Sequence, residues 1–187
     1  MAGSALFGLA PYRREYSYIR EDVSVTKCKD ELVRPVGSWV AVVTPFADDD
    51  RVDMEGFCRL VDFHVDNGSD GLIFLGSTGE ATSLSIEEKR EIVASMAPYC
   101  RGKIPAFFGV TCPTTRDTVK LAEYAEEKGA DGVMMVVPPY VAPPQEAIYE
   151  YFATVAKSIS IGVALYNNPS RVIVNIDPET VVRLSEI

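Results

Sequence analysis

The chain has 187 residues, of which 47% are hydrophobic and 24% are charged, a composition typical of a soluble globular protein with one sizeable core. Its 18 lysines and arginines stand against 27 aspartates and glutamates, which gives a formal net charge of −9. This charge repels phosphate backbones and anionic lipid surfaces, so we expect neither nucleic acid nor a membrane as a partner.

The cysteines and apolar runs bear on the cellular compartment. The sequence contains no C-x-x-C pair and no His-x-x-x-His partner, so no zinc site is expected. No run approaches the roughly 18 to 20 apolar residues that span a bilayer, and no basic segment precedes the short apolar stretch of residues 1–10. We therefore expect a reduced, cytoplasmic protein.

The chain divides into an amino-terminal extension, residues 1–36, and a patterned region, residues 37–187. The extension has no sustained helical or strand periodicity, and its role is open. In the patterned region, short apolar runs are nearly continuous, as parallel strands covered on both faces require. The predicted strands are Trp39–Val43, Leu72–Leu75, Ile104–Val110, Val133–Val137 and Val163–Tyr166.

Amphipathic segments with helix caps lie between these runs. The expected start and stop residues are Asp53 and Gly68, Ser85 with Glu88 as a capping box, Thr115 and Gly129, and Asp177-Pro178 for a last helix that runs to Ile187. The expected inward faces are Phe57, Leu60, Val61 and Val65; Ile92 and Met96; Val119, Ala122 and Ala125; and Ile148, Tyr151, Phe152 and Val155. Strand and helix therefore alternate five times.

Five strand-then-helix units of about 30 residues each indicate the α/β class and, within it, an incomplete (β/α)8 TIM barrel of about five βα units. A complete barrel of about 250 residues averages roughly 31 per unit, which agrees with this spacing. A doubly wound sheet has the same alternation. However, no G-x-G-x-x-G follows the first strand, so its usual dinucleotide chemistry has no support.

In such a barrel the active groups follow the carboxyl ends of the strands. The loops at these ends are rich in hydroxyl groups, contain two tyrosines and an arginine, and have few carboxylates; they are residues 44–46, 76–80, 111–115, 138–140 and 167–171. This combination suits the binding of a carboxylate and the movement of protons. We therefore expect neither a metal nor another cofactor.

Each candidate residue also has a purely structural interpretation. The Gly76–Gly79 turn can present backbone N–H groups to an anion or be only a tight turn. Tyr166 can be a proton carrier or a core tyrosine, and Arg171 can bind a carboxylate or be a solvated loop charge. His64, on the inner stripe of the first helix, is interpreted as a packing residue, and Glu80 as an acceptor that fixes the turn.

The motifs GSTGE (76–80), VPPY (137–140) and YNNPSR (166–171), together with TPF (44–46) and DPET (177–180), resemble the dihydrodipicolinate synthase and N-acetylneuraminate lyase family over about residues 37–187. The resemblance implies a lyase or aldolase that acts on pyruvate or a related 2-oxo acid through a lysine Schiff base, 4-hydroxy-tetrahydrodipicolinate synthase-like. It also implies a homo-oligomer, a dimer or a tetramer.

The resemblance implies roles for individual residues. Tyr166 would shuttle protons, and Ser77, where synthases of the family usually have threonine, would relay them. Tyr140 would complete the relay by reaching across a dimer interface. The substrate-binding residues would be Thr78, Gly79, Arg171 and Thr44, with Thr78 and the turn at the pyruvate carboxylate and Arg171 at the second substrate.

Two departures from the family pattern leave the substrate and reaction direction open. Ser77 and Asn168 are closer to the lyase, aldolase and sugar-acid branches than to the lysine-biosynthetic synthases. The family's Schiff-base lysine lies at the end of the sixth strand, which this chain does not reach.

The seven lysines present do not replace that lysine. They fall in the extension (Lys27, Lys29), at polar helix positions (Lys89, Lys120, Lys128, Lys157) or before the third strand (Lys103). None is expected to be desolvated in the pocket, which is how such amines become nucleophilic. Alone, this polypeptide is therefore predicted to be inactive. The alternative function is a truncated, non-catalytic paralogue that binds a carboxylate metabolite or a full-length subunit.

Overall fold

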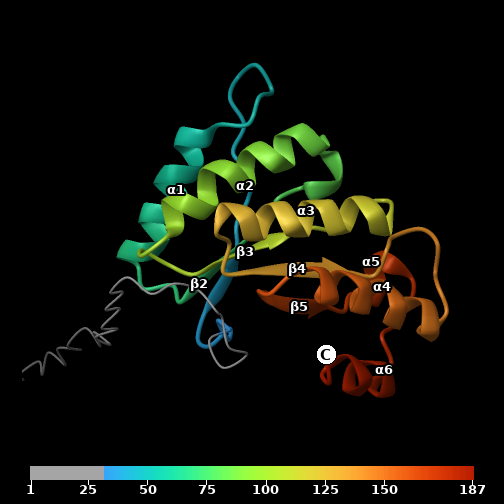
Figure 1. Ribbon diagram of the computed structural model, residues 1–187. Helices are drawn as coiled ribbons and strands as arrows, with labels where there is room; N and C mark the ends of the chain where they lie inside the picture. The colour runs from blue at the N-terminus through green and yellow to red at the C-terminus, as the bar shows by residue number, and fades with distance from the viewer. Residues whose placement is uncertain (1–31) are drawn as a thin grey trace, which may run out of the picture.

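The computed structural model describes residues 32–187. Most of the predicted extension, with Lys27, Cys28 and Lys29, lies outside the described residues. The described part contains one sheet of five parallel strands in the order β1-β2-β3-β4-β5 (Figure 1). The strands are β1 Trp39–Ala41, β2 Gly71–Phe74, β3 Ala106–Gly109, β4 Gly132–Val136 and β5 Gly162–Tyr166. The predicted α/β fold, an incomplete barrel of five βα units, is confirmed.

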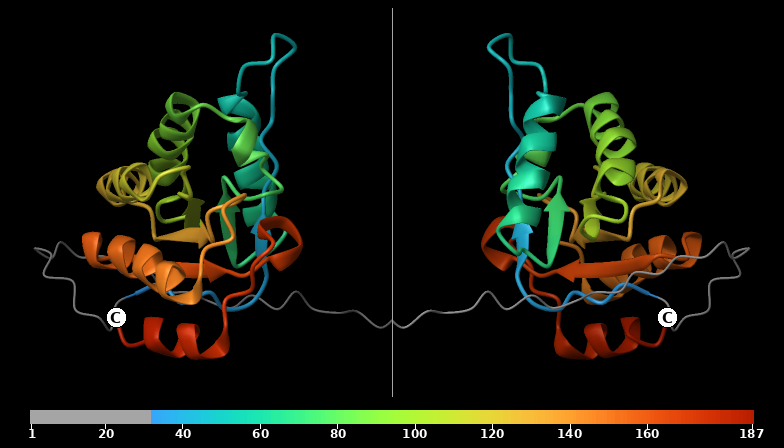
Figure 2. Two further views of the ribbon diagram at one scale, coloured as in Figure 1. Left: turned by 90° about the vertical axis from the view of Figure 1, so that its right-hand side faces the viewer. Right: turned by 90° about the vertical axis from the view of Figure 1, so that its left-hand side faces the viewer.

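The helices alternate with the strands and lie beside one another. They are α1 Met54–Asp66, α2 Ile86–Cys100, α3 Thr115–Lys128, α4 Gln145–Ser158, α5 Pro169–Val172 and α6 Pro178–Leu184, with a short 3-10 turn, η2 Ala81–Ser83. Each long helix packs against the next one along the chain, and α4 packs against α6. Figure 2 shows them following one another around one side of the sheet. None of the described helices is long and apolar enough to cross a bilayer.

Local capping sets the helix boundaries much as predicted. The Asp53 side chain accepts a hydrogen bond from the Gly56 amide (2.8 Å), and Ser85 and Glu88 form a reciprocal capping box. Gly129, at a φ of 87°, ends α3. These contacts satisfy N–H and C=O groups that a helix leaves unpaired at its ends.

Val65 was wrongly predicted to face the core. Its side chain is 37% exposed, whereas Phe57 and Val61 on the same helix are buried. At 3.6 residues per turn, Val65 lies about 80° around the helix from Phe57, at the flank of the apolar stripe. Among the described helices, only α2 packs closely against α1.

Alternation along the strands separates two faces of the sheet. Leu72, Phe74 and Phe108 point toward the helices and are fully buried, and the Phe74 and Phe108 rings stack with centroids 5.0 Å apart. The opposite, inner face is only half-buried at residues such as Ile73 and Met134. The helix-covered face therefore carries most of the core, and the inner face is partly open.

Carboxylates hold the amino-terminal ends of alternate strands. Asp70 accepts a hydrogen bond from the amide before β1 (Ser38, 2.6 Å), and Asp131 accepts one from the first amide of β3 (3.0 Å). Glu126 does the same for Ser160 before β5 (2.8 Å). These bonds satisfy backbone donors at the sheet end opposite the predicted site.

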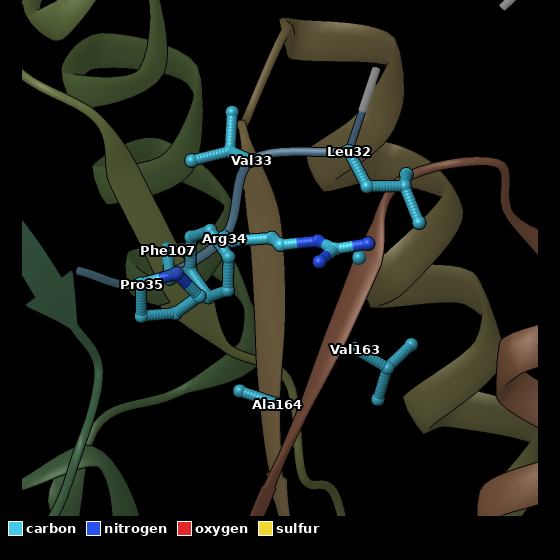
Figure 3. A pocket seen from close by; sticks show the side chains of 8 residues that line it. Leu32, Val33, Arg34, Pro35, Phe107, Val163 and Ala164 are labelled. Atoms are coloured by element: carbon cyan, nitrogen blue, oxygen red, sulfur yellow. The ribbon is translucent and has the colours of Figure 1, made fainter. Parts of the chain in front are cut away.

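The inner face is hollowed at β5. A cavity of about 230 Å³ lies between residues 32–35 and strands β3 and β5, and Figure 3 shows the Arg34, Phe107 and Val163 side chains that line it. A second cavity of about 230 Å³ lies on the other face of β5, against α4 and α6. Within the described residues, β5 has a paired neighbour only on its β4 side.

Gly109→Ala is expected to destabilise the protein by about 1–3 kcal/mol, because the added methyl group would overlap the backbone carbonyl of Leu75. Gly162→Ala is the matched control in a neighbouring part of the sheet, since its nearest new contacts would be at 3.8 and 4.0 Å. Urea denaturation followed by circular dichroism measures both changes. Equal midpoints for the two variants would contradict the close approach of β3 to Leu75.

Cys100 is expected to resist alkylation. Burial, reinforced by the charge of Asp131, raises the pKa of its thiol to about 12. At about pH 8 only roughly one molecule in ten thousand would then carry the reactive thiolate. The half-buried Cys58 is the internal control. Iodoacetamide treatment followed by mass spectrometry should label Cys58 first, and labelling of both cysteines at one rate would refute the packing described.

Candidate active site

The chain after β2 forms a tight turn with free donors. Within it the Gly79 amide donates to the Gly76 carbonyl (3.1 Å) and the Glu80 amide to the Ser77 carbonyl (3.2 Å). The amides of Ser77 and Thr78 have no acceptor in the part of the chain that the structure describes, and both residues are exposed. Two successive N–H groups at the rim of the sheet are suited to an anion.

Thr44 and Gly79, both predicted to bind substrate, contact each other. The Thr44 side chain is buried at 6% exposure, and its hydroxyl donates to the Gly79 carbonyl (2.6 Å). A side chain at Gly79 would come within 3.1 Å of the Val42 carbonyl and 3.3 Å of the Thr44 hydroxyl. The contacts observed for this pair thus hold the turn in place. The Gly79 amide is occupied within the turn itself.

Tyr166 ends β5 in register with Val136 of β4. Strand alternation places Tyr166 on the inner face with Ala164 and Met134, and its side chain is half-buried there. The Met134 methyl group reaches within 3.4 Å of the position that a Gly76 side chain would occupy. The Met134 side chain therefore extends across the inner face from β4, the strand next to Tyr166, to the turn after β2.

Tyr140 and Arg171 follow β4 and β5 at the same rim. Tyr140 is 93% exposed at a φ of 78°, in the loop between β4 and α4. Arg171 is exposed on α5, and its guanidinium forms no ion pair or hydrogen bond with residues 32–187. The structure thus brings Ser77, Thr78 and Tyr166 to one rim and leaves Tyr140 and Arg171 projecting from it.

Hydrogen bonds between amide side chains, which the sequence did not predict, tie the segment after β5 to the start of α4. Asn167 donates to the Asn175 side chain (2.7 Å) and accepts from the Ile176 amide (3.2 Å). Gln145, at the start of α4, donates to the Asn175 carbonyl (2.7 Å) and accepts from the Thr180 hydroxyl (2.8 Å). The loop after β5 is therefore tied to the helix that follows the Tyr140 loop. Only the Asn-Asn pair at the end of β5 hinted at it.

Lys89 was wrongly placed at a polar helix position. Its side chain is only 9% exposed, in line with Ile92, Val93 and Met96 on the face of α2 toward the sheet. Burial raises the pKa of the nearby Cys112 thiol, and the Lys89 charge partly offsets that rise. Lys89 belongs to the helix-covered side, and none of the five strands carries a lysine.

His64 and Glu80 each hydrogen-bond to residues close by in the sequence. The His64 ring lies 3.0 Å from the Ser69 hydroxyl and is half-buried, away from the rim. Glu80 is exposed and adopts a left-handed conformation, and its backbone carbonyl accepts from the Ser83 amide (2.8 Å). Its carboxylate accepts no hydrogen bond from residues 32–187, so the prediction that this side chain fixes the turn was wrong. In residues 32–187 no group of three or more His, Cys, Asp or Glu side chains is arranged to hold a metal ion.

Parallel βα units with polar side chains after the strands define the chain as part of a barrel-type α/β protein. The sequence model of the Dihydrodipicolinate synthetase family matches residues 34–187, so the chain belongs to this family. It is 40% identical over 151 residues to the 4-hydroxy-tetrahydrodipicolinate synthase of Laribacter hongkongensis, covering 81% of this chain and 52% of that protein. The enzyme of the same name from Nitrosomonas eutropha is 36% identical with the same coverage. The chain spans about half the length of the curated relatives it matches.

Solved structures of family members superpose on this chain. The dihydrodipicolinate synthase from Aquifex aeolicus superposes with a TM-score of 0.78 at 39% identity, over 80% of this chain and 51% of that one. YagE, a family member from E. coli K12 in complex with pyruvate, has a TM-score of 0.78 at 32% identity, over 80% and 50%. The enzyme from Acinetobacter baumannii, also complexed with pyruvate, has a TM-score of 0.77 at 35% identity, over 81% and 52%.

Thr44→Val is expected to loosen the turn, because it removes the buried donor to the Gly79 carbonyl and leaves that acceptor unsatisfied, a cost of about 1–3 kcal/mol. Thr44→Ser keeps the hydroxyl and serves as the control. Amide hydrogen exchange at Gly79 and Glu80, measured by NMR, should accelerate in the valine variant only. Unchanged exchange there would show that the Thr44 hydroxyl does not hold the turn.

Proposed function

We propose that the whole protein is a lyase or aldolase, 4-hydroxy-tetrahydrodipicolinate synthase-like, that acts on pyruvate or a related 2-oxo acid through a lysine Schiff base. Membership of the family supports this, as do the names of the relatives and the pyruvate bound to two of the solved ones. The observation that carries the proposal is that the amides of Ser77 and Thr78 have no acceptor in residues 32–187 and lie at the same rim as the inner-face hydroxyl of Tyr166.

The substrate carboxylate would lie on the turn after β2. The amides of Ser77 and Thr78 would donate to its oxygens, with the Thr78 hydroxyl beside them, and these donors are already oriented because Thr44 and Gly79 fix the turn. The exposed guanidinium of Arg171 would bind the carboxylate of the second substrate at the mouth. This set of contacts needs no cofactor.

The covalent step needs a lysine, which we place on the strand that follows residue 187. Its neutral amine would add to the carbonyl carbon of the 2-oxo acid, and loss of water would leave an imine. Removal of a methyl proton then gives an enamine, the nucleophile for carbon–carbon bond formation. Tyr166 would carry protons to and from these intermediates, and Ser77 would relay them.

Tyr140 is proposed to act in a neighbouring subunit. Its 93% exposed side chain has no partner among residues 32–187 and projects from the rim. In a homo-oligomer, a dimer or a tetramer, it would reach the partner's rim and complete the proton relay there. A cytoplasmic location is part of this proposal.

A non-catalytic paralogue is the second candidate. In such a protein the amides of Ser77 and Thr78, which have no acceptor in residues 32–187, would still bind a carboxylate metabolite. Such a protein would bind pyruvate, or a full-length subunit, without forming an imine.

Borohydride trapping with labelled pyruvate separates the two functions. The full-length gene product should gain a stable label, because borohydride reduces an imine to an amine that cannot hydrolyse. The chain of residues 1–187 alone should gain none. In the full-length protein, Tyr166→Phe should lower turnover by about 10²- to 10⁴-fold with the fold intact, since it removes the proton carrier.

A reading frame that stops at residue 187, or a full-length protein that binds pyruvate without a trapped adduct, would support the paralogue instead. Lys89→Arg is the matched control for labelling, because Lys89 is buried on the helix side of the sheet. Loss of label in this variant would mean that the wrong lysine has been proposed.

A further inference from the structure

Asn168 uses its side chain in an unusual way for its position. It is the N-cap residue of α5, and its backbone carbonyl accepts from the amides of Arg171 (3.0 Å) and Val172 (3.1 Å). An asparagine N-cap ordinarily also accepts an amide hydrogen bond through its side chain, but this one makes no such bond. Its side chain is turned back toward β5 instead.

The side chain of Asn168 contacts the hydroxyl of Tyr166. Its Nδ2 donates to the Tyr166 oxygen at 2.6 Å, and its Oδ1 accepts from the Ser170 hydroxyl at 2.7 Å. With a lone pair occupied by the amide, the phenol must point its own proton elsewhere. No acceptor for that proton is present in residues 32–187. The proton is therefore available to a ligand on the inner face.

The neighbouring asparagine has a different task. Asn167 holds the loop through Asn175 and Ile176, and Gln145 ties Asn175 to α4. Among residues 32–187, in contrast, the Asn168 side chain bonds only to Tyr166 and Ser170, which belong to its own short motif. The loop is thus held without it, so replacing Asn168 should change the surroundings of the Tyr166 hydroxyl rather than the fold.

We propose that Asn168 is a positioning residue for Tyr166: its amide N–H holds the phenol oxygen and leaves the phenol proton directed at the substrate. The inference rests on the proposed function, in which Tyr166 carries protons to and from the enamine. It assigns a role to the second asparagine of the YNNPSR motif, where the direction of one hydrogen bond decides which way the proton is delivered.

Asn168→Asp tests the direction of that bond. A carboxylate is nearly the same size as the amide but can only accept, so it would draw the Tyr166 proton toward itself and away from the substrate. Asn168→Ala removes the contact without reversing it. Ser170→Ala is the matched control, since it removes the other partner of Asn168 and leaves the donor to Tyr166 in place.

The first measurement needs no activity. The protein is labelled with 3-fluorotyrosine, and the ¹⁹F resonance of Tyr166 is assigned by its loss in Tyr166→Phe. Both Asn168 variants should shift this resonance, and Ser170→Ala should shift it less. Circular dichroism checks that the fold is unchanged. A resonance that is indifferent to both Asn168 variants overturns the inference, whatever the protein does with pyruvate.

The second measurement uses the full-length protein and pyruvate alone. The enamine exchanges the methyl protons of pyruvate with D₂O, and NMR follows this exchange. Asn168→Ala should lower the kcat of exchange by about 3- to 10-fold, the loss of one hydrogen bond, with KM for pyruvate unchanged. Asn168→Asp should lower it further. Asn168→Gln, which keeps the N–H donor, should recover part of the loss.

The outcomes separate this inference from the proposed function. Absence of a trapped imine in the unsubstituted protein overturns the proposed function and the positioning role with it. A trapped imine with unchanged kcat in every Asn168 variant overturns this inference alone. Full activity in Asn168→Asp beside a loss in Asn168→Ala would mean that the side chain accepts from Tyr166, which also overturns it.

Discussion

All five strands run in one direction, and this constraint decides where polar side chains can meet. In a parallel sheet every carboxyl end lies at one rim, so residues separated by some 90 positions, such as Ser77 and Tyr166, are brought to the same edge by strand direction alone. The order of the strands follows the order of the chain. The rim can therefore carry a site whose parts come from separate βα units.

Backbone amides are paired differently at the two ends of the sheet. At the amino-terminal end, carboxylates such as Asp70 and Asp131 accept backbone amides that enter the strands. At the carboxyl-terminal end, the amides of Ser77 and Thr78 have no acceptor within residues 32–187, and the Tyr166 hydroxyl accepts from the Asn168 side chain. Within residues 32–187, backbone donors are therefore satisfied at one end of the sheet and available at the other.

Local and periodic features of the structure were predictable from the sequence. The capping box at Ser85 and the glycine that ends α3 are properties of a few adjacent residues, and the strands are short apolar runs bounded by turns. Family motifs also placed Tyr166 and the turn at the rim. These features depend on neighbours in the chain, which a sequence displays directly.

Other features depend on distant partners and were not predictable. Lys89 is buried because a stripe of apolar residues on its helix faces the sheet, which outweighs the usual preference of lysine for water. The bonds of Gln145 to the segment near Asn175 join residues about 30 positions apart. Which way the Asn168 side chain turns was likewise open, since an N-cap asparagine would ordinarily bond to its own helix.

Trp39 is the single tryptophan of the chain, and its ring packs edge-on against Phe107 at a centroid distance of 4.9 Å. The bare Cα atoms of Gly71 and Gly132 make room for these two rings, because a methyl group at either glycine would overlap them. The Phe107 ring also lines the cavity on the inner face of β5. Tryptophan fluorescence of this protein thus comes from Trp39 alone, whose ring contacts the Phe107 ring at the cavity, and it can serve as an optical reporter of what fills that space.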